Sequence, residues 1–78
     1  MLMEDRKIMI YYISKRINKE LFYLHDVDNK NGTTPGAKWT REVDRGLMFY
    51  DQRNAQLFIA KYLRNRNDLF IYQTLQTL

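Results

Sequence analysis

Apolar side chains occupy both alternating sets of positions in every segment of this chain that has strand character. Residues 8–13 contain isoleucine and tyrosine at odd and even positions alike, and residues 21–24 and 69–72 show the same arrangement. Successive strand residues point to opposite faces of a sheet, so these strands are apolar on both faces. A sheet with one solvated face carries polar residues on that face. This sheet therefore requires cover on both sides.

The order of strand signals predicts a hairpin, a loop and one later strand. β-branched and aromatic residues dominate residues 7–27, with a polar interruption between two apolar runs, which predicts a β-hairpin. Residues 28–37 contain the only proline and two of the three glycines, so we expect a mobile loop. A final strand is predicted over residues 68–73, followed by a frayed tail at residues 74–78.

Two helices are predicted between the loop and the final strand. Thr40 is a candidate N-cap for a helix over about residues 40–48, which Gly46 weakens. Residues 38–43 have an alternative interpretation as a strand, because Trp39, Arg41 and Val43 occupy alternate positions. Asp51 is the candidate N-cap of a longer helix over residues 51–64. Its apolar stripe at helical spacing consists of Ala55, Phe58, Ile59, Tyr62 and Leu63.

These elements predict a single α+β domain over residues 1–78. The architecture expected is a small antiparallel three-stranded sheet with two helices on one face, in the order β-β-α-α-β. The last strand is able to pair with either edge of the hairpin. With 78 residues and no cysteine, the domain has no disulfide, so apolar packing must hold it together, alone or with a partner.

No spacing of residues selects an enzyme or a metal site. His25 and Asp26 point to opposite faces if they lie in a strand. The acidic run from Asp26 lacks the glycine and the bidentate glutamate of a calcium loop. Ser14 and His25, the only serine and the only histidine, lie across the hairpin without an orienting third group. The sequence therefore predicts no catalytic residue, no metal and no cofactor.

The apolar second face of the sheet is the main functional signal. Two helices cover one face, so the other face is predicted to bind a macromolecule, with a loop folded over part of the sheet as the alternative. A homodimer through this face and a docking face for another protein fit equally well. The predicted partner-binding residues are Tyr11, Tyr12, Phe22, Tyr23, Leu57 and Tyr72.

A positive net charge of +4 supports an alternative function. The predicted basic patch consists of Lys15, Arg16 and Lys19 at the hairpin turn, with Lys61, Arg64 and Arg66 at the end of the longer helix. Basic residues beside exposed aromatic rings suit single-stranded nucleic acid. No nucleic-acid-binding motif accompanies them, so a small basic nucleic-acid-binding protein is the second hypothesis.

Neither export nor membrane insertion is expected. The first residues lack the apolar core of a signal peptide. No segment approaches the roughly 20 apolar residues that span a bilayer. We therefore expect a cytoplasmic protein that does not interact with membranes.

One group of residues resembles a pattern found in small bacteriophage and prophage proteins. It consists of Trp39-Thr40, Gly46-Leu47-Met48-Phe49, Asp51 and Ala55, within residues 37–72. Gly46 stands where alanine is more usual. The resemblance implies core positions for Trp39 and Phe49, and an accessory protein that binds host proteins.

The resulting functional hypothesis is a non-enzymatic phage-type accessory protein. It would bind a host protein in the host cytosol and inhibit or modulate it, for example as an anti-defence protein. This hypothesis depends on the resemblance for its biological setting. It depends on the apolar second face for its mode of action.

Overall fold

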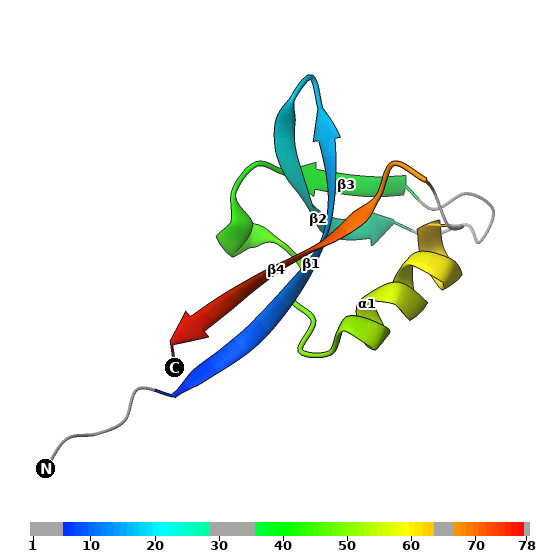
Figure 1. The fold of residues 1–78 in the computed structure, drawn as a ribbon. Coiled ribbons are helices and arrows are strands. Elements are labelled where there is room, and N and C mark those ends of the chain that lie inside the picture. Colours follow the sequence, from blue (N-terminus) through cyan, green and yellow to red (C-terminus); the bar gives the residue numbers. More distant parts are fainter. Residues whose placement is uncertain (1–5, 29–35, 64–66, 78) are drawn as a thin grey trace, which may run out of the picture.

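The computed structural model describes residues 6–28, 36–63 and 67–77, and its strands form a single antiparallel sheet (Figure 1). The short 3-10 helix η1 (Val43–Arg45) precedes the α-helix α1 (Gln52–Phe58), which continues into a π-helical turn, η2 (Ile59–Leu63). The strands are β1 (Lys7–Ile17), β2 (Glu20–Asp28), β3 (Gly36–Thr40) and β4 (Phe70–Thr77). Their order across the sheet is β3-β2-β1-β4.

The predicted three-stranded sheet with two helices on one face is wrong. Within the described residues the sheet has four strands, and α1 with its η2 extension is the one long helical segment. This segment covers most of the helix predicted over residues 51–64. Its predicted cap is confirmed, because Asp51 Oδ1 accepts a hydrogen bond of 2.9 Å from the backbone N–H of Arg53.

The helix predicted over residues 40–48 is also wrong, because long-range pairing governs this segment. Residues 36–40 form β3, in which Trp39 pairs with Leu24 of β2 and packs against a buried core. Thr40 does not cap a helix. Its Oγ1 accepts a hydrogen bond of 3.1 Å from the backbone N–H of Glu42, where the strand turns into η1. The alternative strand interpretation over residues 38–43 overlaps β3.

Strand pairing also takes in residues that were expected to be loop or tail. β2 and β3 include both ends of the predicted loop 28–37, and residues 29–35 lie outside the described residues. The final strand, predicted over 68–73, continues through most of the expected tail. β1 provides a partner from Ser14↔Phe70 to Lys7↔Thr77, so main-chain hydrogen bonds also hold Gln73 and Gln76, which have little local preference for strand.

The β1–β2 connection is a two-residue turn at Asn18 and Lys19. Both residues have positive φ, at 52° and 70° respectively. This combination defines a type I′ turn, whose twist matches that of the flanking strands. Asn tolerates the left-handed region, whereas a lysine there is strained.

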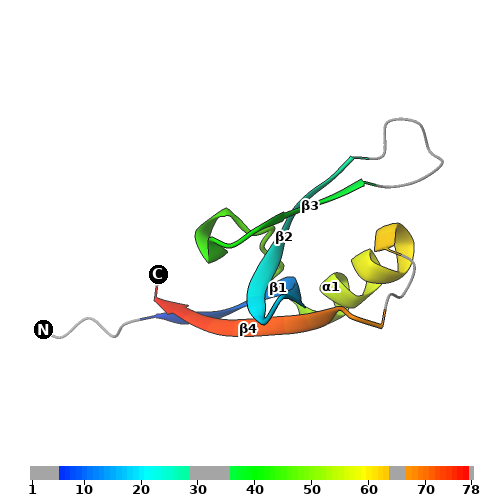
Figure 2. The ribbon, with the colours of Figure 1, turned by 90° about the horizontal axis from the view of Figure 1, so that it is seen from above.

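The two strands of the hairpin separate soon after the turn. β1 and β2 pair only between Ser14↔Tyr23 and Ile17↔Glu20. Beyond this point β1 runs beside β4 and β2 beside β3, so two ribbons diverge, with α1 between them at one end (Figure 2). The segment after η1 fills the opening, because Phe49 exchanges backbone hydrogen bonds of 2.8 and 2.9 Å with Tyr11.

Each face of β1 has its own buried cluster. On the helix face, Ile13 packs with Leu24, Ala55 and Leu63 beneath α1 and η2. On the opposite face, which we call the tyrosine face, Ile10 packs with Tyr12 and Tyr23. The apolar residues at both sets of alternating positions in β1 therefore belong to two cores, one on each face of the strand.

Candidate binding surface

Three tyrosines from three different strands form the centre of the tyrosine face. Tyr12 on β1, Tyr23 on β2 and Tyr72 on β4 have ring centroids 5.5 to 6.4 Å apart, with edge-to-face or tilted geometry. The strand register brings them together, because Tyr12 is directly opposite Tyr72 and Ser14 is directly opposite Tyr23. Such ring pairs contribute about 0.5–1.5 kcal/mol each beyond the burial of their area.

Two residues extend this cluster to the surface. Phe70 lies opposite Ser14 on the tyrosine face and is 37% exposed. The guanidinium carbon of Arg16 lies 5.9 Å from the centroid of the Phe70 ring, which is within the range of a cation–π contact. Arg16, Phe70 and the half-buried Tyr72 together form what we call the open patch.

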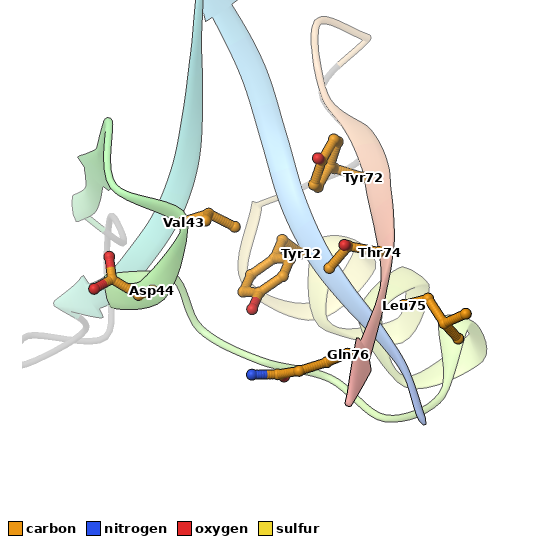
Figure 3. Close-up of a pocket in the computed structure, with 7 residues that line it drawn as sticks. All are labelled: Tyr12, Val43, Asp44, Tyr72, Thr74, Leu75 and Gln76. Carbon is orange, nitrogen blue, oxygen red and sulfur yellow. The ribbon is translucent and has the colours of Figure 1, made fainter. Parts of the chain in front are cut away.

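A hollow adjoins the open patch at Tyr72. Its volume is about 210 Å³, and the close-up shows β4 on one side of it and the η1 segment on the other (Figure 3). Asp44 contributes a carboxylate on the η1 side, whereas the open patch has the guanidinium of Arg16. The lining residues are Tyr12, Val43, Asp44, Tyr72, Thr74, Leu75 and Gln76. The surface therefore carries a cation at one end and an anion at the other, with aromatic and apolar groups between.

The buried tyrosines retain their protons near neutral pH. Burial raises the pKa of Tyr12, and the neighbouring Tyr50 and Asp44 raise it further. Burial, followed by the proximity of Tyr72, likewise raises the pKa of Tyr23. The centre of the tyrosine face is therefore uncharged, and its charges lie only at the edges.

The structure divides the predicted partner-binding residues among several environments. Tyr12 and Tyr23 are only 4% and 9% exposed, so they support the surface from below. Tyr72 borders the hollow, as described. Tyr11 and Phe22 alternate with the tyrosine-face positions and are half-buried on the other side of their strands. Leu57 is 57% exposed on α1, away from both cores.

Phe70 is the residue that the sequence interpretation missed. The alternation in residues 69–72 places Phe70 on the same face as Tyr72, and this signal was present in the sequence. What the sequence does not specify is the direct pairing of Ser14 with Phe70 and of Tyr12 with Tyr72. These pairings place the side chains of Phe70 and Tyr72 on the same face of the sheet as those of Tyr12 and Tyr23.

The described members of the predicted basic patch lie at separate places in the fold. Lys15 and Arg16 are consecutive strand residues on opposite faces, with Lys15 Nζ 4.4 Å from the centroid of the Trp39 ring. Lys19 is exposed in the turn, and Lys61 Nζ lies 5.2 Å from the Tyr62 ring on η2. The remaining members, Arg64 and Arg66, lie outside the described residues.

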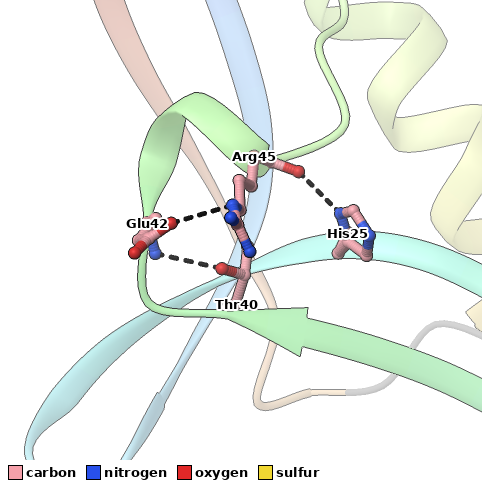
Figure 4. Close-up of polar contacts among 4 residues, drawn as sticks. All are labelled: His25, Thr40, Glu42 and Arg45. Atoms are coloured by element: carbon pink, nitrogen blue, oxygen red, sulfur yellow. Dashed lines mark hydrogen bonds and ion pairs between the residues drawn. The ribbon is translucent and has the colours of Figure 1, made fainter.

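Polar contacts place His25 in a structural role. His25 marks the irregularity in the β2–β3 register, between the paired residues Leu24 and Asp26. Its Nδ1 lies 2.8 Å from the carbonyl oxygen of Arg45, which requires that Nδ1 carry a proton and donate it (Figure 4). Arg45 is in turn ion-paired with Glu42 at 3.0 Å. The bulge therefore fixes the position of η1 beside the sheet.

Ser14 and His25 are not hydrogen-bonded to each other. Ser14 is fully buried on the tyrosine face, and its Oγ has no hydrogen-bond partner among the described residues. Residues 6–28, 36–63 and 67–77 also contain no group of three or more His, Cys, Asp or Glu residues placed to hold a metal ion. In the same part of the chain, no helix is both long enough and apolar enough to cross a membrane.

Comparison of the chain with protein-family models, with curated proteins and with solved structures gives no match. The resemblance to phage proteins therefore stays a prediction.

Proposed function

We propose that this protein acts by binding another protein through the open patch and its adjoining hollow, without catalysing a reaction. The supporting observation is the exposed Phe70 beside Arg16, above a packed tyrosine cluster. Interface cores are enriched in aromatic residues and arginine and depleted of other charges. A rigid support under such residues reduces the entropy lost when they bind.

The charge arrangement favours a protein partner. Asp44 lines the hollow, where its carboxylate would repel a nucleic-acid phosphate. A protein surface is able to present an acidic group to Arg16 and a basic group to Asp44. Such complementarity fixes the orientation of the partner and excludes others.

We further propose that the partner is a host protein in the host cytosol, inhibited or modulated by a phage-type accessory protein. This setting is drawn from the sequence resemblance. Among the positions that carry the resemblance, Ala55 is buried and Trp39 and Phe49 pack against the same cluster. An anti-defence protein is one member of this functional class.

The test compares Phe70→Ser with Leu57→Ser, a matched change of an exposed apolar residue on α1. Protein captured from host lysate is identified and purified, and its affinity for each variant is then measured by calorimetry. We expect Leu57→Ser to bind like the original protein and Phe70→Ser to bind at least about tenfold more weakly, a loss of about 1.4 kcal/mol. Equal affinities for the two variants, both with unchanged unfolding midpoints, would show that the open patch is not the binding surface.

The second candidate function is binding of single-stranded nucleic acid near the hairpin turn, favoured by Arg16 beside Phe70 and by Lys19. Its test is retention of the protein on random single-stranded DNA or RNA at several salt concentrations. Salt-dependent binding that a Lys15/Arg16/Lys19 charge-reversal variant loses would support it. Absence of binding near physiological salt would eliminate it.

A further inference from the structure

The outer edge of β4 is long, regular and free of charge. β4 pairs with β1 at eight consecutive positions without a bulge, and residues 70–77 contain no charged residue, proline or glycine. It is a terminal strand of the sheet, and no described strand lies beyond it. Natural proteins usually protect such edges with charges, prolines or bulges, because an exposed edge pairs readily with another strand.

The direction of the unpaired backbone groups follows from the pairing on the other side of β1. Tyr11 directs its N–H and C=O toward Phe49, away from β4. Backbone direction alternates along an antiparallel ladder, so the even-numbered residues of β1 bond to the even-numbered residues of β4. The open edge of β4 therefore presents the N–H and C=O groups of Ile71, Gln73, Leu75 and Thr77.

The ends of β1 and β4 form a two-stranded arm. The arm projects away from α1 and from the other ribbon, with Thr77 opposite Lys7 at its end (Figure 1). It leaves Leu75 55% exposed. Two-stranded ribbons are marginally stable in water unless further strands or a packed layer support them. The arm therefore has both open backbone groups and a need for an additional strand.

We propose that β4 pairs antiparallel with β4 of a second copy of this chain, in a register centred on Thr74. This register places Gln73 opposite Leu75 of the other copy and Ile71 opposite Thr77. Thr74 faces its own counterpart, and Thr–Thr is a favourable cross-strand pair. Each edge-facing residue then exchanges two backbone hydrogen bonds with its counterpart, and the two arms become the four central strands of one continuous sheet.

A second copy fits this edge because two antiparallel β4 strands match each other's open N–H and C=O groups in this register. The net charge of +4 opposes self-association in general. The paired residues themselves contribute no charge, and the cations of the hairpin turn adjoin the Phe70 end of β4, away from Thr74. Directly opposite strand residues point to the same face, so the two tyrosine faces form one surface. The dimer therefore presents two open patches on the same side.

The absence of cysteine allows a direct test of this register. Across the proposed interface Thr74 is a non-hydrogen-bonded pair, whose Cα separation of about 4.5 Å suits a disulfide. We expect Thr74→Cys to form a disulfide-linked dimer with oxidised glutathione. Leu57→Cys is the matched control on α1 and should remain at least about tenfold less cross-linked under the same conditions.

Self-association is measured by analytical ultracentrifugation over a concentration series. The N–H of Gln73 faces the open edge, so Gln73→Pro blocks the new ladder without removing a β1–β4 hydrogen bond. We expect a concentration-dependent dimer for the original protein and a monomer for Gln73→Pro, with unchanged circular dichroism. A monomer for the original protein at all concentrations would refute the proposal, as would a dimer that Gln73→Pro leaves intact while both cysteine variants cross-link equally.

Discussion

The two faces of β1 show two ways of covering the same strand. On the helix face, Ile13 lies under a regular helical segment that also buries Ala55 and Leu63. On the tyrosine face, Tyr12 is covered by other aromatic rings and by the η1 segment at Gly46. The helix leaves a hollow of about 320 Å³ beside Val27, Leu47 and Phe58 on its side of the sheet, whereas rings and a short turn leave Phe70 and a smaller hollow exposed on the other. What distinguishes the candidate binding face from the helix face is therefore the exposed Phe70 beside Arg16.

The largest expected effect tests how tightly the helix face is packed around Ile13. Ile13 is fully buried, so Ile13→Ala should lower the free energy of unfolding by about 2–5 kcal/mol, and Ile13→Val by about 0.5–1.5 kcal/mol. Urea denaturation followed by circular dichroism measures both. A loss below about 0.5 kcal/mol for Ile13→Ala would mean that this face is no better packed than the open patch.

A smaller effect is expected from the turn that covers the tyrosine face. A Cβ on Gly46 would lie 2.8 Å from Cδ1 of Tyr12 and 3.1 Å from the carbonyl oxygen of Val43. Gly46→Ala should therefore lower the free energy of unfolding by about 1–3 kcal/mol. In a Tyr12→Leu background the same change should cost less, which a double-mutant cycle measures. If the free-energy changes of the two substitutions are strictly additive, the segment at Gly46 does not pack against Tyr12.

Ser14 tests whether the tyrosine face contains an uncompensated polar group. Its buried Oγ has no partner among the described residues, so Ser14→Ala should raise the free energy of unfolding by about 1 kcal/mol. Thr40→Ala is the control of opposite sign, because the Thr40 hydroxyl accepts a hydrogen bond from Glu42. Chemical denaturation of both variants provides the comparison. Destabilisation by Ser14→Ala would mean that the hydroxyl is satisfied in solution.

The smallest effect appears only at alkaline pH. Burial raises the pKa of Tyr12 and Tyr23, so the unfolded chain loses these protons before the folded chain does. The contribution to stability is complete below about pH 10 and is lost as the pH rises through the raised folded values. Thermal unfolding from pH 8 to 11 should show this loss, and Tyr12→Phe should reduce it. An identical slope for Tyr12→Phe would assign the alkaline sensitivity to other groups.

Local signals were sufficient to locate the elements whose own residue pattern is strong. The continuous apolar run at residues 8–13 marks β1, and the stripe from Ala55 to Leu63 marks α1 and η2. Asp51 caps the helix, as its position before the stripe predicted. In these segments the residue pattern and the tertiary contacts favour the same structure.

The rest depended on pairing between distant segments. Gln73 and Gln76 have no strong strand preference, and pairing with β1 makes them part of β4. Trp39 enters a strand because β2 has an open edge beside Leu24. The path of η1 decides that Tyr12 is covered while Phe70 stays exposed. The sequence therefore predicted that aromatic residues form the candidate surface. It did not predict which of them are buried beneath that surface and which are exposed on it.

The register of β1 with β4 also determines how the molecule assembles in time. Lys7 pairs with Thr77 across almost the entire sequence printed here, whereas the β1–β2 turn joins neighbouring residues. Closing a long loop costs more entropy than closing a hairpin, so the hairpin forms early and β4 docks late. Before β4 docks on β1, neither the open patch at Phe70 nor the outer edge of β4 has formed. Refolding should therefore show one concentration-independent phase, followed by a slower phase that accelerates with protein concentration as copies meet.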